Sequence, residues 1–554
     1  MKYPPHTRRA SAPARRAPTR ARRASVLAAL ACAAAGLCSG HAQATEREDI
    51  EQLRNTALGL IEALVEQGLL KREKADELMK KAQSRNVTDA AGNPARVGAD
   101  GKPVVRVPYV PESVKAEIRE QVKQDVLAQA KQERWGDPGA LPDWIDRIHF
   151  EGDLRLRLEQ DLFDRNNAPA SIYALQTIGP AYGVDLTNTT EDRFRMAIRA
   201  RFGFTAKIGD TVSGGFRLAT GSLSSPTSTS QTLGANASNF NRYTIGLDRA
   251  YLRWEPRRWL RLDGGRMPNP FFSTDLVWAE DLAFDGVAAT LKANLSPNFL
   301  AYATGGVFPL QETGVTKNDR WLTGVQAGGE WEWSPRARIK FGIAQYQFRN
   351  MEGSPQAVGS SGLTTYGQNE YGKNVRQKGN TLFNIADPGL PAGSSPLWAL
   401  APRFRPLNLT ATVDLSHFDP VHVIFTADYV KNNGFDRAEI LTRTGIDLEP
   451  KTTGYQYRLA VGMPSMTAPR DWQIFGMLRQ LERDAVIDGF TDTTWHLGGT
   501  NYRGYSIGGS YAIDRNAWMT LRWTSTKNLV DYNAGASGLP LAIDVLQMDL
   551  NARF

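Results

Sequence analysis

From residue 147 to the end of the chain, apolar and polar positions alternate with a period of two. In the segment 193–202, for example, Phe194, Met196 and Ile198 share one face, while arginines occupy alternate positions. This period predicts β-strands, because successive side chains on a strand point to opposite faces. We expect strands at sixteen segments: 147–162, 191–207, 211–222, 245–256, 259–268, 283–294, 299–309, 321–333, 337–349, 407–418, 421–432, 453–463, 471–482, 501–513, 516–527 and 543–554.

The connections between these segments alternate between short turns and long loops. Short turns such as 209–210 and 296–298 are followed by longer connections rich in Gly, Ser, Asn and Asp. Sixteen strands then have seven turns at one end and eight loops at the other, as transmembrane β-barrels do. Strands of this length cross an apolar band of roughly 25 Å. The sequence therefore predicts an all-β membrane protein with a transmembrane barrel of about 16 antiparallel strands over residues 146–554.

Other patterns also favour a barrel in a lipid bilayer. After residue 44 no apolar segment approaches the roughly 20 residues of a membrane-spanning helix, and only helices and closed barrels satisfy their backbone groups in lipid. Tryptophans near the strand ends fit aromatic girdles: Trp254, Trp259, Trp331, Trp333, Trp472, Trp518 and Trp523. The last strand ends at Phe554 and resembles the C-terminal strand of outer-membrane proteins, whose final aromatic residue is an assembly signal for the barrel-assembly machinery.

The residues ahead of the barrel have a helical period instead. Apolar side chains recur every three or four positions among charged ones. We expect a short N-terminal α-helical segment in the periplasm, with helices at 45–84 and 113–135 joined by a linker at 85–112. Its narrow apolar stripe fits either a coiled coil with a partner helix or a surface helix packed on the rest of the protein.

Residues 1–44 have the three parts of a secretory signal peptide. A basic stretch ends at Arg22-Arg23, an apolar run continues to Leu37, and Ala42-Gln43-Ala44 provides a cleavage site between small residues. The paired arginines would also fit a twin-arginine signal, and Cys38 a lipoprotein anchor. Both cysteines of the sequence lie in this segment, so the exported chain has no disulfide and no thiolate metal site.

The formal net charge of +8 also originates in the signal segment. Residues 1–44 carry eight basic side chains and no acidic one, and removing these eight from the 66 Lys and Arg residues leaves 58 basic and 58 acidic side chains. The exported chain is therefore formally neutral, which removes the electrostatic basis for nucleic-acid binding.

Several stretches of the exported chain resemble the putative porin family of Proteobacteria. They are Val110-Pro111-Glu112-Ser113-Val114 ahead of a helix, Leu141-Pro142-Asp143-Trp144-Ile145, Gly152-Asp153-Leu154-Arg155-Leu156-Arg157, and Gly265-Arg266-Met267-Pro268-Asn269-Pro270-Phe271 with Trp278 downstream. The resemblance implies a channel in the outer membrane of a Gram-negative bacterium, in contact with lipid and lipopolysaccharide. The phosphate-selective porins share this plan and are the nearest alternative family.

An arginine-rich face marks the first two strands of the predicted barrel. If the apolar face of each strand meets lipid, the interior receives these pore-lining candidates: Arg155, Arg157, Arg193, Arg195, Arg199 and Arg201. Guanidinium groups along a pore attract anions. They could equally pair with carboxylates of the lumen and stiffen the wall, and both roles are compatible.

The third long loop, 268–282, combines acidic with apolar residues. Asp275, Glu280 and Asp281 lie among Phe, Leu, Val and Trp side chains, which would not stay extended in water. We therefore expect the loop to fold inward as a constriction loop that faces the arginines and creates a transverse field. The alternative is packing at a trimer interface.

No residue pattern of an enzyme stands out in the exported chain. We expect no catalytic, cofactor-binding or metal site, since only four histidines remain and no nucleophile–base arrangement is distinctive. The expected function is passive diffusion of small hydrophilic solutes, leaning toward anions, with a homotrimer as a possible assembly. The alternative is a structural barrel whose helical segment tethers it to peptidoglycan or a periplasmic partner.

Overall fold

The computed structural model describes residues 147–173, 181–182, 186–235, 239–314, 318–531 and 540–554. The predicted signal peptide and N-terminal helices lie outside the described residues. The described chain is dominated by sixteen long strands: β1 (Ile148–Phe163), β3 (Arg193–Lys207), β4 (Val212–Thr220), β6 (Ile245–Arg257), β7 (Leu260–Pro268), β8 (Ala283–Ser296), β9 (Phe299–Gln311), β10 (Arg320–Ser334), β11 (Ala337–Arg349), β14 (Pro406–Phe418), β15 (Val421–Asn432), β16 (Thr453–Gly462), β17 (Trp472–Leu481), β18 (Tyr502–Asp514), β19 (Ala517–Asn528) and β20 (Ala542–Arg553).

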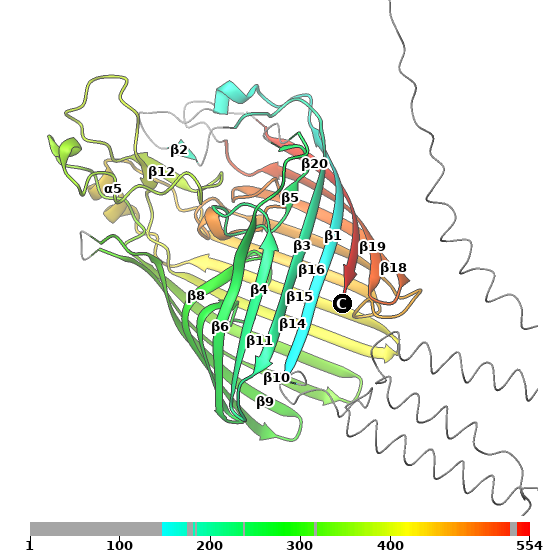
Figure 1. Ribbon diagram of the computed structural model, residues 1–554. Coiled ribbons are helices and arrows are strands. Elements are labelled where there is room, and N and C mark those ends of the chain that lie inside the picture. Colours follow the sequence, from blue (N-terminus) through cyan, green and yellow to red (C-terminus); the bar gives the residue numbers. More distant parts are fainter. Residues whose placement is uncertain (1–146, 174–180, 183–185, 236–238, 315–317, 532–539) are drawn as a thin grey trace, which may run out of the picture. The chain divides into compact units, whose positions relative to one another are not determined.

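These strands form a closed antiparallel barrel (Figure 1). Each strand pairs with its neighbours in sequence, and β1 pairs with both β3 and β20, so that the sheet has no free edge. The predicted count of sixteen strands is confirmed, and the predicted ends differ from the observed ones by no more than two residues. Among the described residues, no helix has the length and apolar character needed to cross a bilayer.

The two faces of the barrel differ in chemistry. Leu154, Phe202 and Val325 are about half exposed on the outer face, at 53%, 49% and 61%, as are many other apolar side chains of alternate positions. An exposed apolar belt of this kind suits contact with lipid. Most of the predicted girdle tryptophans are exposed near the short-turn ends of their strands: Trp254, Trp259, Trp331, Trp333 and Trp472.

The long loops contain small elements that the period of two did not predict. β2 (Ala181–Tyr182), β12 (Thr381–Asn384) and β13 (Trp398–Leu400) form a separate three-stranded sheet, and β5 (Gln231–Thr232) pairs with β3. The helix α5 (Arg437–Thr444) begins after Asp436, whose side chain accepts two backbone hydrogen bonds, and ends at Gly445. Single-turn 3-10 helices are η1 (Ala170–Tyr173), η3 (Ser360–Gly362) and η4 (Asp488–Phe490). These elements are too short to carry a recognisable period.

The largest buried apolar cluster joins loop residues to inward-facing residues of the strands. Trp278, Tyr346, Trp495 and Tyr502 are each at most 3% exposed and belong to this cluster. Because the outer face of the barrel presents its apolar groups to the surroundings, the packed core forms where the loops meet the inside of the wall. The loop residues of this cluster are therefore held in place against the inside of the wall.

The barrel closes at a backbone contact between the two ends of the strand order. Gly152 and Phe554 exchange two backbone hydrogen bonds of 3.0 Å, and a Cβ atom on Gly152 would collide with the Phe554 ring. Glycine at this position thus leaves room for the terminal aromatic side chain. This closing contact between the first and last strands, which we call the seam, depends on both residues.

We expect Gly152→Ala to lower the yield of folded barrel, because the new methyl group displaces the Phe554 ring from the closing seam. Deleting Phe554 should have a larger effect, since two backbone hydrogen bonds are lost as well. The fraction of heat-modifiable protein in gel electrophoresis measures both. The matched control is Gly476→Ala on β17, where an added Cβ meets nothing within 4 Å. Equal yields for all three variants would contradict this view of the seam.

Candidate functional site

The connection between β7 and β8, residues 269–282, runs through the inside of the barrel; we call it the inner loop. Its residues contact four different parts of the wall. They hydrogen-bond to Gln326 on β10 and Asp428 on β15, and they form ion pairs with Arg479 on β17 and Arg201 on β3. A segment that reaches strands so far apart in the strand order must cross the lumen.

Apolar side chains hold the inner loop in this position. Phe271, Leu276 and Trp278 are at most 5% exposed. The rings of Phe271 and Trp278 both meet Tyr346 of β11 edge-on, with centroids 5.2 and 5.1 Å apart. Burial of these groups keeps the loop out of water and against the wall.

Asp281 anchors one end of the inner loop on β3. Its carboxylate lies 3.0 Å from Arg201 and 3.5 Å from Arg199, and it accepts hydrogen bonds from the backbone and hydroxyl groups of Thr229. Burial alone would raise the pKa of Asp281, but the two arginines and the Thr229 hydrogen bonds outweigh it and lower the pKa. The carboxylate is therefore charged at neutral pH.

Asp275 anchors the middle of the inner loop on β16 and β17, another part of the wall. Its carboxylate lies 2.6 Å from the Arg479 guanidinium and accepts a 2.9 Å hydrogen bond from Gln456. Here too burial would raise the pKa, and the Arg479 charge together with these hydrogen bonds lowers it. The third predicted acidic residue, Glu280, is exposed and is in none of the ion pairs among the described residues.

The predicted arginines lie on the inward-facing side of β1 and β3, and four of them pair with carboxylates. The strand register places Glu159 opposite Arg195 and Asp153 opposite Arg201. The ion pairs are Arg157 with Asp549, Arg195 with Glu159, and Arg199 and Arg201 with both Asp153 and Asp281. Much of this arginine face therefore neutralises carboxylates of the wall and of the inner loop.

The other two predicted arginines have different surroundings. Arg155 donates a 2.5 Å hydrogen bond to the Ser230 hydroxyl and is in no ion pair with a described carboxylate. Arg193 is exposed at the first position of β3 and takes part in none of the ion pairs among the described residues. Of these two arginines, Arg155 therefore adds an uncompensated charge to the inner face near the pairs.

Several further arginines on the inner wall were missed by the sequence reasoning, among them two that share one aromatic ring. Arg458 on β16 and Arg522 on β19 lie over the ring of Phe475 on β17, with 5.2 and 5.6 Å between guanidinium carbon and centroid. Arg458 also donates to Gln473, and neither arginine is in an ion pair with a described carboxylate. The alternation that identified the β3 arginines would have found them, because exposed apolar residues flank both.

The comparison with protein families decides what kind of barrel this is. A family model described as putative porin matches residues 54–554, most of the chain. The chain belongs to the putative porin family. Membership in this family and the closed sixteen-stranded barrel point to a channel of the outer membrane rather than an enzyme. No curated protein matches the sequence.

Solved structures of outer-membrane proteins resemble this family member in fold. OprB of Pseudomonas putida at high pH has 9% identity, with 74% of this chain and 96% of that chain covered, and a TM-score of 0.43. DcaP of Acinetobacter baumannii has 10% identity, coverage of 74% and 97%, and a TM-score of 0.36. OmpF of Salmonella typhi, in complex with daunomycin, has the same four values.

We expect Asp281→Asn to loosen the inner loop, because Arg199 and Arg201 lose one of their two shared carboxylates. Losing such charged hydrogen bonds costs on the order of 2 kcal/mol. In planar bilayers the variant should show larger and noisier single-channel currents. The matched control is Glu280→Gln, which removes the same charge from an exposed neighbour. Identical changes in both variants would show that the Asp281 contacts do not anchor the loop.

Proposed function

We propose that this member of the putative porin family forms a water-filled channel for passive diffusion of small hydrophilic solutes, with a preference for anions. The observation that supports the preference is the unequal pairing of charges inside the barrel. Asp275 and Asp281 of the inner loop are held by arginines, whereas Arg155, Arg458 and Arg522 have no carboxylate partner among the described residues.

Glu280 of the inner loop is exposed and in no ion pair among the described residues, and one buried carboxylate of the wall also departs from this pattern. Asp428 has no cationic partner among the described residues, but it is 2% exposed and accepts hydrogen bonds from Thr274 and Asn408. A group enclosed in this way faces the protein rather than the solution. The accessible interior charge is therefore positive in balance on the walls formed by β16, β19 and β1.

A positive balance matters in a narrow lumen. Screening by salt acts over roughly 8 Å at physiological ionic strength, so fixed charges on a confined wall are felt by passing ions. Rings of arginine in a pore attract anions and repel cations. Arg458 and Arg522 are held against Phe475, which keeps their guanidinium groups in place along the wall.

We also propose an orientation for the chain in the membrane. The first residue of β1, Ile148, is opposite Ala206, next to the short turn between β3 and β4. The segment that precedes β1 therefore joins the barrel at its short-turn end. We place this end and the segment 45–135 in the periplasm and the long loops outside, with lipid, lipopolysaccharide, the barrel-assembly machinery and a homotrimer as expected partners.

We expect the combined change of Arg155, Arg458 and Arg522 to Gln to shift the reversal potential in a salt gradient toward cations. The anion-to-cation permeability ratio should fall at least about twofold, because the uncompensated charges of the wall are removed. The control is Arg437→Gln, which removes an exposed charge on α5 that is paired with Asp447. A ratio that stays unchanged in the triple variant would refute the proposed origin of selectivity.

The orientation is tested with protease applied to intact cells. Cleavage should occur within residues 350–405, the longest loop, and spare residues 45–134. Cleavage in the N-terminal segment before the loop would place that segment outside. A barrel that inserts normally but carries no current would instead favour the tethering role.

A further inference from the structure

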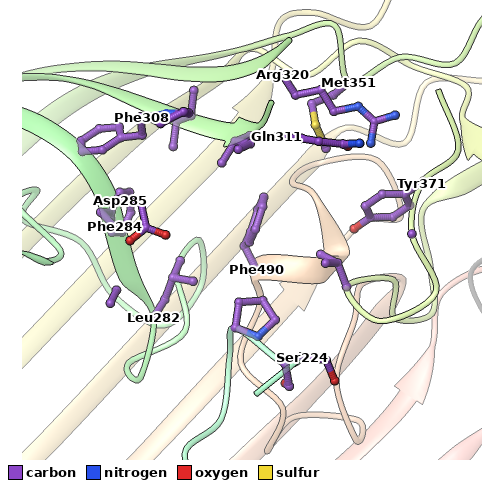
Figure 2. Close-up of a pocket in the computed structure, with 18 of the residues that line it drawn as sticks. Ser224, Leu282, Phe284, Asp285, Phe308, Gln311, Arg320, Met351, Tyr371 and Phe490 are labelled. Carbon is purple, nitrogen blue, oxygen red and sulfur yellow. The ribbon is translucent and has the colours of Figure 1, made fainter. Parts of the chain in front are cut away.

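A pocket of about 610 Å³ lies at the loop end of the barrel. The inner-loop residues that form ion pairs, Asp275 and Asp281, do not line it. Its lining comes from the ends of β8, β9 and β10, from Trp278 and Leu282 at the inner loop, and from three other loops. Figure 2 shows Phe490 in its centre, with Gln311, Arg320 and Met351 above and Leu282 and Ser224 below. We call this the mouth pocket. Its volume suits a small organic molecule.

Much of the mouth pocket wall is apolar and firmly packed. Phe308, Leu322 and Met351 are at most 5% exposed, and they line the pocket together with Phe490. The Phe490 ring stacks on Phe348 with 6.0 Å between centroids, which fixes η4 at this place. A wall of this kind can hold an aromatic or branched aliphatic body out of water.

Arg320 is a buried charged residue in this wall. It is 5% exposed, and its two terminal nitrogens donate only to backbone carbonyl oxygens, to Glu370 at 3.1 and 3.2 Å and to Gln368 at 3.4 Å. No ion pair among the described residues includes it. A buried guanidinium held by neutral groups alone is costly, and an anion would offset that cost.

The other charged and polar groups of the pocket form no ion pair with Arg320. Arg266 and Asp285 neutralise each other at 2.8 Å. The Tyr371 hydroxyl donates to Asp488 instead of facing a solute. Glu370 contributes its backbone oxygen to Arg320, and its carboxylate is in none of the ion pairs among the described residues.

From this arrangement we infer that the mouth pocket binds an organic anion before it enters the channel. The carboxylate or sulfonate of the solute pairs with Arg320, and its aromatic or aliphatic body packs against Phe490, Leu282 and Met351. The Glu370 carbonyl oxygen already accepts from both terminal nitrogens of Arg320, so the solute carboxylate pairs with the remaining N–H groups of the guanidinium, which has five in all. This inference rests on the proposed channel function and names a class of solute for it.

The experiment uses the purified full-length chain in planar bilayers. Adding 3-phenylpropionate at millimolar concentration should interrupt the open-channel current, with an interruption frequency that rises with concentration. Phenethylamine and 3-phenylpropanol, which keep the body but replace the anion, should interrupt it at least tenfold less. Acetate, which keeps only the anion, should also be weak. Equal block by the acid and the alcohol, or block by phenethylamine as strong as that by the acid, would overturn the inference.

Variants then assign the block to Arg320. Arg320→Gln should weaken block by 3-phenylpropionate at least tenfold, whereas Arg320→Lys, which keeps a charge and a donor for Glu370, should lose less. Arg437→Gln removes a charge from the same end of the barrel outside the pocket and should leave block unchanged. Unaltered block in Arg320→Gln would overturn the assignment.

The outcomes separate the two proposals. A protein that inserts but carries no current refutes the channel itself. A protein that conducts with anion preference, yet shows no selective block by the acid, keeps the channel and refutes the mouth pocket as an anion site.

Discussion

The fold depends on one constraint: a backbone inside lipid must find all its hydrogen-bond partners within the protein. Sixteen strands meet this requirement only because β20 returns to pair with β1, and the terminal Phe554 completes that seam against Gly152. Closure fixes which face of every strand meets lipid. The apolar side chains at alternate positions then point outward, and all charged side chains of β1 and β3 point inward.

Inside the barrel, a second constraint follows, because charges gathered in a small volume must be paired or exposed to water. The register of β1 with β3 brings carboxylates opposite arginines, and the inner loop supplies Asp281 and Asp275 to two walls. Ion pairs and buried aromatic residues thus hold the loop together across the lumen. The cations left over, chiefly on β16 and β19, provide the electrostatic character that we propose for the channel.

The strands could be predicted from the sequence because their signal is local. A period of two is set by neighbouring residues, and it located all sixteen strands and directed the arginines inward. The loop structure could not be predicted in this way. β2 and β12 pair across some two hundred positions, and Arg320 finds its partners on the backbone of a distant loop, where side-chain identity carries no signal. Arg458 and Arg522 were within reach of the sequence, since their exposed neighbours Tyr457, Leu459, Leu521 and Trp523 follow the same alternation.

The central claim is that uncompensated arginines on the inner wall set the selectivity of an open channel. It is tested most directly by the reversal potential of the unmodified protein in a planar bilayer between two concentrations of potassium chloride. The account predicts stepwise single-channel currents and a reversal potential with the sign of chloride preference, decreasing as ionic strength rises and the wall charges are screened. A cation-selective potential, or one that does not depend on ionic strength, would contradict it.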